Sequence, residues 1–198
     1  MKSIIKLEPT EFRQFIEKNN PQTWGEVSTE IGDNLRKYML RHEQNFQCAY
    51  TEIRIENDST VSHIDHFHKQ SMFPKKRFLW NNLLTSCNSE FYGAKFKDKR
   101  ITESDYKYLI NPVLSNPATH LEYAITGEIL SKDEYGKTTI ELFNLNDKSL
   151  VEQRSTIAKQ IKLMCNDFEV DELINQYMKF ETFIRFVYNF YKAVDNQY

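Results

Sequence analysis

The sequence predicts an α+β fold that is mainly helical, with a small β-β-α unit between N-terminal helices and a helical C-terminal region. Apolar residues recur at three- and four-residue spacing toward both ends of the chain, as in amphipathic helices. Two short strand-like runs lie within residues 49–67. We expect one domain over residues 1–165, with its β-β-α core at about 46–100, and an amphipathic C-terminal extension over residues 166–198.

Two helices are expected before the β-β-α unit. Residues 9–19 place Phe12, Phe15 and Ile16 at helical spacing, and their leading proline suits a first helical turn. A second helix is expected over residues 23–44. Its apolar stripe consists of Val27, Ile31, Leu35 and Met39.

The β-β-α unit follows. Residues 49–55 and 60–67 are expected to form two strands, because they are β-prone and flank the turn signal Asn57-Asp58-Ser59. The helix that closes the unit is expected over residues 88–99.

The rest of the chain is expected to be a short hairpin and then helices. The hairpin covers residues 121–130 and turns at Gly127, and helices are expected over 138–145 and 148–163. The tail from 171 to 193 is strongly amphipathic. Its stripe consists of Leu173, Ile174, Tyr177, Phe180, Phe183, Ile184, Val187, Phe190 and Tyr191. Such a stripe is typical of a core, and at a chain end it also suits docking of a partner subunit.

The net charge of −2 conceals a basic segment. Residues 69–100 hold eight basic and two acidic side chains, so that segment carries +6 and the rest of the chain −8. A local positive field attracts polyanions whatever the overall charge. The side chains expected to contact nucleic acid are Lys75, Lys76, Arg77, Lys95 and Lys97.

Composition also indicates the compartment. No run of about 18 apolar residues occurs, so no membrane partner is expected, and the first residues lack the apolar stretch of a secretory signal. The three cysteines, Cys48, Cys87 and Cys165, are an odd number and lie far apart, which favours reduced thiols. We expect a bacterial cytoplasmic protein.

The most informative motif is the run Ser62-His63-Ile64-Asp65-His66-Phe67, followed by Trp80-Asn81-Asn82-Leu83-Leu84. This is the order of groups in an HNH nuclease site. His66 suits a general base, since a free imidazole titrates near pH ~6.5. Asp65 suits a ligand for Mg²⁺ or Mn²⁺. Asn82 is expected to hold the loop between the two segments, so that His66 keeps its direction.

His63 has two interpretations. In an extended segment it shares a face with Asp65, so it is either a ligand or a partner of the metal site. A structural histidine with satisfied hydrogen bonds is an equal alternative.

These motifs, with Cys48-Ala49-Tyr50, Ile110-Asn111-Pro112 and the runs at 124–129 and 139–154, carry a resemblance over most of residues 1–160. The chain resembles the HNH nuclease subunits of Septu-type anti-phage systems, the PtuB-like family, which also occurs as a retron effector. The resemblance implies a metal ligand at Asp65, a base at His66 and the family's asparagine at Asn82.

The same resemblance implies function and partners. The expected substrate is nucleic acid, with DNA favoured and RNA such as tRNA the alternative. The expected partner in a hetero-oligomer is a PtuA-like ABC/SMC-type ATPase that gates the nuclease. In a retron context, the partners would also include a retron reverse transcriptase and its msDNA.

The chain departs from the family at its cysteines and its third metal ligand. Many relatives carry Cys-x-x-Cys pairs for structural zinc, but here Thr51 and Glu90 stand at the second positions, so no structural zinc is expected. If Cys87 begins a lost pair, the ligand position falls on Phe91, which cannot bind metal. We favour Asn88, an oxygen ligand, on the assumption that the segment has shifted. Lys95 or Lys97 would then contact phosphate.

A second hypothesis comes from a different class of protein. The lost cysteines and the aromatic residue at position 91 suit a degenerate HNH domain that binds nucleic acid or serves as a scaffold. The intact Asp65-His66 pair favours the enzyme, since a binding module does not need a base beside a carboxylate.

Overall fold

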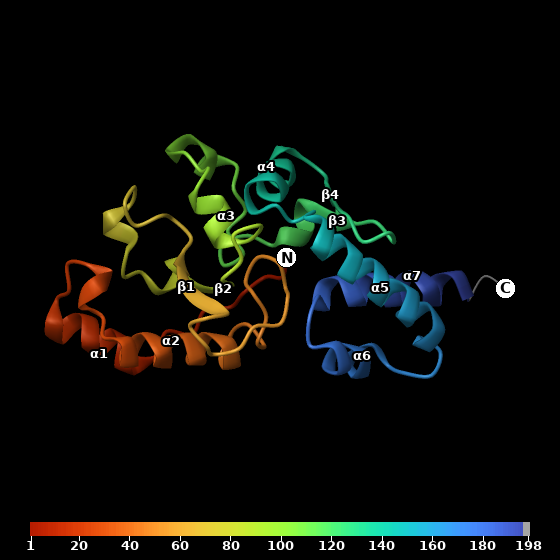
Figure 1. The fold of residues 1–198 in the computed structure, drawn as a ribbon, viewed down its shortest axis with the longest axis horizontal. Coiled ribbons are helices and arrows are strands. Elements are labelled where there is room, and N and C mark those ends of the chain that lie inside the picture. The colour runs from red at the N-terminus through yellow and green to blue at the C-terminus, as the bar shows by residue number, and fades with distance from the viewer. Residues whose placement is uncertain (196–198) are drawn as a thin grey trace.

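The computed structural model describes residues 1–195, without the side chain of the last of them, so the end of the expected 166–198 extension lies outside the described residues (Figure 1). The helices are α1 (Thr10–Asn19), α2 (Thr29–His42), α3 (Ala94–Asp98), α4 (Glu134–Phe143), α5 (Lys148–Met164), α6 (Val170–Tyr177) and α7 (Glu181–Asp195). The strands are β1 (Ser62–His66), β2 (Leu83–Cys87), β3 (Leu121–Tyr123) and β4 (Ile129–Ser131). They form two antiparallel two-stranded sheets, β1–β2 and β3–β4. This architecture confirms the predicted α+β, mainly α class.

The molecule is elongated (Figure 1). Helices α1 and α2 lie beside the β1–β2 sheet toward one end of the long axis, and α5, α6 and α7 form the other end. Within the described residues, every helix is too short or too polar to cross a membrane.

The predicted second helix begins later than expected. Residues 24–26 form a short 3-10 helix, Val27 is extended, and α2 starts only after Ser28, whose hydroxyl accepts from the backbone N–H of Ile31. The cause is local, because Thr23 with Glu26 and then Ser28 provide two successive N-terminal caps.

One predicted strand is correct and the other is wrong. β1 lies inside the expected 60–67, but residues 49–51 form a turn, and the only β pairing within 49–55 is an isolated bridge from Arg54 to Gln47. The true partner of β1 is β2, with His66 opposite Leu83 and Ser62 opposite Cys87. All five residues of β2 are buried, so it lacks the alternation of apolar and polar residues that marks a half-exposed strand.

The closing helix is shorter than predicted. α3 begins only at Ala94, because Gly93 adopts a positive φ of 79°. A Cβ at Gly93 would lie 3.1 Å from Sγ of Cys87, so the turn favours glycine for space as well as for conformation. The chain therefore turns sharply after β2 and returns as α3, completing a β-β-α order.

The C-terminal tail forms two helices whose apolar face is part of the chain's own core. Met178 and Phe180 have positive φ values and separate α6 from α7. Phe183, Ile184 and Val187 of α7 are fully buried in one cluster with residues of α5. The stripe from Phe180 to Tyr191 is therefore core over most of its length, with Phe190 43% exposed, and its role as a partner-docking surface stays a prediction. The predicted boundary between the nuclease domain and the C-terminal extension, after residue 165, lies within this cluster, because residues on both sides of it pack together.

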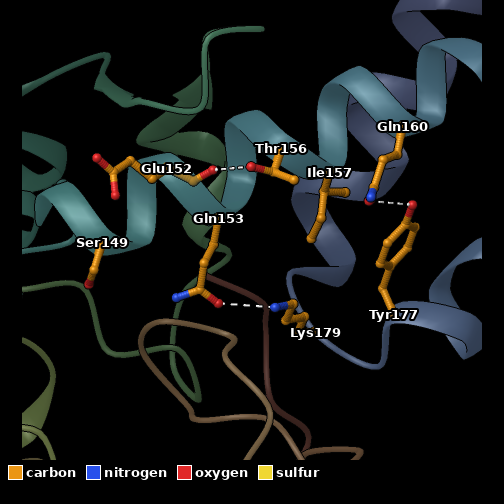
Figure 2. A pocket seen from close by; sticks show the side chains of 8 residues that line it. All are labelled: Ser149, Glu152, Gln153, Thr156, Ile157, Gln160, Tyr177 and Lys179. Carbon is orange, nitrogen blue, oxygen red and sulfur yellow. Dashed lines mark hydrogen bonds between the residues drawn. The ribbon is translucent and has the colours of Figure 1, made fainter.

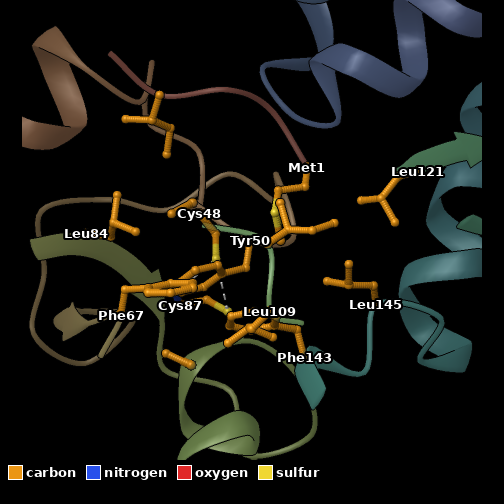
Figure 3. Packing of buried hydrophobic residues seen from close by; sticks show 14 of the residues in the cluster. Met1, Cys48, Tyr50, Phe67, Leu84, Cys87, Leu109, Leu121, Phe143 and Leu145 are labelled. Atoms are coloured by element: carbon orange, nitrogen blue, oxygen red, sulfur yellow. Dashed lines mark hydrogen bonds between the residues drawn. The ribbon is translucent and has the colours of Figure 1, made fainter. Parts of the chain in front are cut away.

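The central core holds the β-β-α unit in place. Tyr50, Phe67, Leu84 and Phe143 are all buried there, and the rings of Tyr50 and Phe143 stack with centroids 4.1 Å apart (Figure 3). Burying such a side chain stabilises a fold by about 1.5–3 kcal/mol. The core thus joins the turn that carries Tyr50, the end of β1 and the end of α4.

Candidate active site

Asp65 lies in β1 and is 3% exposed. The Tyr50 hydroxyl donates a hydrogen bond to Oδ2 of Asp65, and Nζ of Lys97 lies 3.3 Å from the same oxygen. Burial would raise the pKa of Asp65, but the Lys97 ammonium and the Tyr50 hydroxyl hold it below the ordinary value. Asp65 is therefore ionised at neutral pH.

His66 is the next residue along β1 and is 6% exposed. Its Nε2 is buried and has no hydrogen-bond partner. Burial lowers the pKa of His66, although the Asp65 carboxylate and a hydrogen bond with the Arg77 main chain act in the opposite direction. The imidazole is therefore neutral at pH 7, with one nitrogen available to accept a proton.

Trp24 packs against His66 and was not among the predicted site residues. Its ring meets the imidazole edge-on, with centroids 4.8 Å apart at 90°, and it stacks on Phe78 on its other side. Trp24 belongs to the short 3-10 helix before α2. The cap formed by Thr23 and Glu26 was the one local signal for an ordered turn at this position.

Asn82 is buried at the end of the loop that connects the strands. Its Oδ1 accepts from the backbone N–H of His68 at 2.8 Å, and its Nδ2 donates to the carbonyls of His68 at 3.2 Å and Lys76 at 3.0 Å. Its own carbonyl accepts from the backbone N–H of Phe67 at 2.9 Å. Asn82, at the end of the loop, therefore bonds to the start of the loop at Phe67 and His68 and to its middle at Lys76. These bonds fix the backbone that directly follows His66.

A cavity of about 330 Å³ brings several of these groups together. It is lined by His63, Ile64, Asp65, His66, Lys69, Gln70, Ser71 and Asp98. Neither Lys69 nor Asp98 was predicted as a site residue. The only sequence signal for Asp98 is an acid beside a lysine in the expected closing helix.

Asn88 lies in a different hollow. It lines an open groove of about 490 Å³ together with Trp24, His63 and Lys95, whereas Asp65 and His66 line the first cavity. Nδ2 of Asn88 donates to the carbonyl of Ser59 at 2.6 Å. His63, whose Nδ1 is buried without a partner, lines both hollows.

The predicted basic residues differ in accessibility. Lys75 is exposed, and Lys76, Arg77 and Lys95 are half-buried. Lys97 is fully buried, so it cannot contact nucleic acid as predicted. Besides Asp65, its ammonium contacts the carbonyl of Phe67 at 3.0 Å, because the short α3 directs this side chain inward.

Two of the three cysteines meet behind β2. Sγ of Cys48 lies 3.7 Å from Sγ of Cys87, and both side chains are buried. Thr51 is buried nearby, whereas Glu90 is exposed and forms ion pairs with Lys95 and Lys99. Among the described residues, no group of three or more His, Cys, Asp and Glu side chains is placed to hold a metal ion.

Another hollow lies far from these groups, between α5 and the turn that joins α6 to α7 (Figure 2). Tyr177 donates to Gln160 and Lys179 donates to Gln153 across it, at 2.9 and 3.0 Å. Its walls hold no histidine, and Glu152 is their one acidic residue, so it lacks the paired histidine and aspartate of the first cavity.

No family model matches the chain. The chain is 27% identical over 147 residues to Septu protein PtuB of Bacillus thuringiensis, covering 72% of this chain and 50% of that protein. It is also 27% identical over 158 residues to Septu protein PtuB of Bacillus mycoides (strain KBAB4), covering 66% and 53%. Septu protein PtuA of that strain is 25% identical over 164 residues, covering 70% of this chain and 23% of that protein.

The chain thus spans about half the length of the PtuB proteins that it matches. Both of these relatives carry the same name, and each match covers about two thirds or more of the chain. Over this shared region the chain is similar to the PtuB proteins of Septu systems.

Proposed function

We propose that this chain is a metal-dependent HNH endonuclease that hydrolyses phosphodiester bonds of nucleic acid in a bacterial anti-phage system. The observation that carries the proposal is the unpartnered Nε2 of His66, beside the ionised Asp65 in one cavity. A buried polar nitrogen without a hydrogen bond lowers the stability of the folded protein. Such groups are found where a ligand or a reaction uses them.

The residues divide the chemistry between them. His66 accepts a proton from the attacking water, because its lowered pKa keeps the imidazole neutral. Asn82 fixes the loop after His66, and Trp24 packs on the ring, so the imidazole keeps one orientation. Nε2 is buried, and we infer that Trp24, which packs on the imidazole ring, covers it and shifts when substrate enters.

Asp65 suits a divalent cation. Its Oδ2 is held by Tyr50 and Lys97, whereas none of the described residues forms a hydrogen bond to Oδ1. A carboxylate oxygen is a preferred ligand of Mg²⁺ and Mn²⁺. When bound, such an ion would stabilise negative charge on the phosphate oxygens.

The substrate is nucleic acid, with DNA favoured over RNA such as tRNA. Lys75, Lys76 and Arg77 lie in the loop that Asn82 holds, and Lys69 lines the cavity itself. These cations lie on the loop and at the cavity, and they support contact with the phosphates of nucleic acid.

A PtuA-like ATPase of the ABC/SMC type is the proposed partner and gate. The support is the PtuB-named relatives and the resemblance to a PtuA-named protein of one of the same strains. Because most of the α7 stripe is buried in the chain's own core, only its exposed part, at Phe190, could contribute to docking. Co-expression with the neighbouring ATPase gene, followed by size-exclusion chromatography, tests the complex.

Cleavage assays test the nuclease itself. Wild type and His66→Ala, each with the ATPase partner, would be compared on supercoiled plasmid and on tRNA, with Mg²⁺, Mn²⁺ or EDTA. His120→Ala is the matched control, since His120 pairs with Asp133 in the region before α4, away from the cavity. We expect metal-dependent cleavage by wild type and the control, and loss of at least 100-fold in His66→Ala.

A second candidate function is a degenerate HNH domain that binds nucleic acid. Two observations favour it: Asp65 is already paired with the buried Lys97, and Phe91, at the family's ligand position, is exposed. If this were the function, wild type and His66→Ala would bind nucleic acid equally and neither would cut it.

A further inference from the structure

Asp98 is a second carboxylate in the cavity of Asp65 and His66, and neither the sequence motifs nor the relatives' names assign it a role. It is the last residue of α3, directly after Lys97. Nζ of Lys97 lies 3.3 Å from Oδ2 of Asp65 and 3.2 Å from Oδ1 of Asp98. One buried ammonium therefore lies between the two carboxylates and holds them on the same cavity.

Oxygen and nitrogen atoms in this cavity are left without hydrogen bonds. Oδ1 of Asp98 is buried without a hydrogen bond, and the cation beside it is Nζ of Lys97, an ion-pair partner at 3.2 Å that it shares with Asp65. Nε2 of His66, on a side chain more than nine-tenths buried, is unpartnered in the same cavity. Two such atoms in one cavity indicate a ligand that satisfies them.

The electrostatics agree with this arrangement. Burial and the charge of Asp65 raise the pKa of Asp98, although Lys97 and Lys69 lower it. Lys97 provides one positive charge for the two carboxylates, so a further cation beside them is favoured. The Asp98 side chain is 35% exposed, so the cavity is open to ions from solvent on this side.

The two carboxylates available as ligands suit a hard divalent cation. Mg²⁺ keeps several waters and is held by one or two carboxylates together with substrate phosphates, so two carboxylates suffice. Soft metals would prefer sulfur, and the buried Cys48 and Cys87 are not among the cavity's lining residues. Asn88, the ligand expected from sequence, lines the other groove.

We propose that Asp65 and Asp98, linked by the buried ammonium of Lys97, are the two protein ligands for a hard divalent cation, Mg²⁺ or Mn²⁺. This inference rests on the proposed nuclease function, since it names the second ligand of that metal site. It assigns Lys97 to positioning the two carboxylates and excludes Asn88 from the metal.

Mn²⁺ binding to the purified chain can be measured by electron paramagnetic resonance. This measurement tests whether Asp65 and Asp98 are the ligands without depending on activity. Asp98→Asn removes the charge and keeps the shape, and Asn88→Ala is the matched comparison. We expect Asp98→Asn to weaken Mn²⁺ binding by at least 10-fold, and Asn88→Ala to change it by less than about twofold. Thermal melting of each variant establishes that it is folded.

Iron-directed cleavage of the wild-type backbone provides a second measurement that needs no variant. Fe²⁺ with ascorbate and peroxide would replace the native ion, and mass spectrometry would locate the cuts. Cuts near residues 65 and 98 support the assignment, and cuts near 88 with none near 98 overturn it. Equal Mn²⁺ affinity of wild type and Asp98→Asn overturns this inference alone. If wild type binds no Mn²⁺ and cuts no nucleic acid, the proposed function fails with it.

Discussion

The ammonium of Lys97 and the carboxylate of Asp65 form an ion pair at 3.3 Å in which both side chains are almost completely buried. Lys97 comes from α3 and Asp65 from β1, so this pair joins the helix of the β-β-α unit to its sheet. The aromatic rings of Tyr50, Phe67 and Phe143 surround the ammonium at 5.7–5.9 Å. Charge and packing together thus hold the carboxylate of Asp65 in one orientation.

Replacing Lys97 by methionine is expected to destabilise the protein strongly. The change leaves Asp65 buried without its cation, which costs about 3–5 kcal/mol in the free energy of unfolding. Urea denaturation measures the loss. Lys99→Met is the control, because Lys99 is largely exposed and should change stability by no more than about 0.5 kcal/mol.

The same variant should show a defined pH dependence. The folded-state pKa of Asp65 is lowered, so its ionised form stabilises wild type above the unfolded-state pKa of about 3.9, and this stabilisation is lost as pH falls through the folded-state pKa. The difference between wild type and Lys97→Met should therefore be greatest near neutral pH and shrink in acid. A difference that stays constant from pH 7 to pH 3 would contradict the ion-pair account.

The acid limb of the pH–rate profile should report on His66. Because burial lowers the pKa of His66, cleavage should be retained below pH ~6.5 and fall only in more acidic solution. Trp24→Ala exposes the imidazole, so its acid limb should move upward toward pH ~6.5. Single-turnover cleavage rates between pH 5 and 8 measure both limbs, and identical limbs would rule out Trp24 as the cover of His66.

Asn82→Ala should loosen the loop between the strands. It leaves the backbone N–H of His68 and the carbonyl of Lys76 without their partner, and each unsatisfied buried group costs about 1–3 kcal/mol. Amide hydrogen exchange should become faster over residues 68–76, and cleavage should fall at least 10-fold as His66 loses its direction. The neighbouring Asn81 is exposed, so Asn81→Ala should leave both unchanged.

The C-terminal helices should be required for the fold. Phe183 of α7 is fully buried, and Phe183→Ala should cost about 3–5 kcal/mol. Phe190 lies on the same helix but is 43% exposed, so Phe190→Ala should cost much less. Equal melting temperatures for the two variants would show that the α7 face is not core.

The sequence predicted the parts of this structure that are encoded locally. The periodicity of neighbouring residues predicted β1 and α5. The order of residues along the chain predicted that Asp65, His66 and Asn82 belong to one motif. β2 was missed because it is buried on both faces. The inward direction of Lys97 depends on the turn at Gly93, which periodicity does not reveal.

Long-range contacts account for the rest. Trp24 reaches His66 from 42 positions upstream, and Asp98 reaches the cavity from 33 positions after Asp65. The local signals at these two residues are weak and do not indicate a site, because both residues come near His66 only when α3 and the turn before α2 pack against β1. The same is true of Cys48 and Cys87, which meet at 3.7 Å from distant parts of the chain.

Chemical rescue is the measurement that tests most directly whether His66 is the base. His66→Gly removes the imidazole and leaves a space beside Trp24, and imidazole supplied in solution can enter that space. The account predicts that His66→Gly, assembled with its ATPase partner and Mg²⁺, does not cut nucleic acid, and that imidazole restores cleavage in proportion to its neutral form. Full cleavage by His66→Gly without imidazole, or a folded wild-type complex that cuts neither DNA nor RNA with any divalent ion, would contradict it.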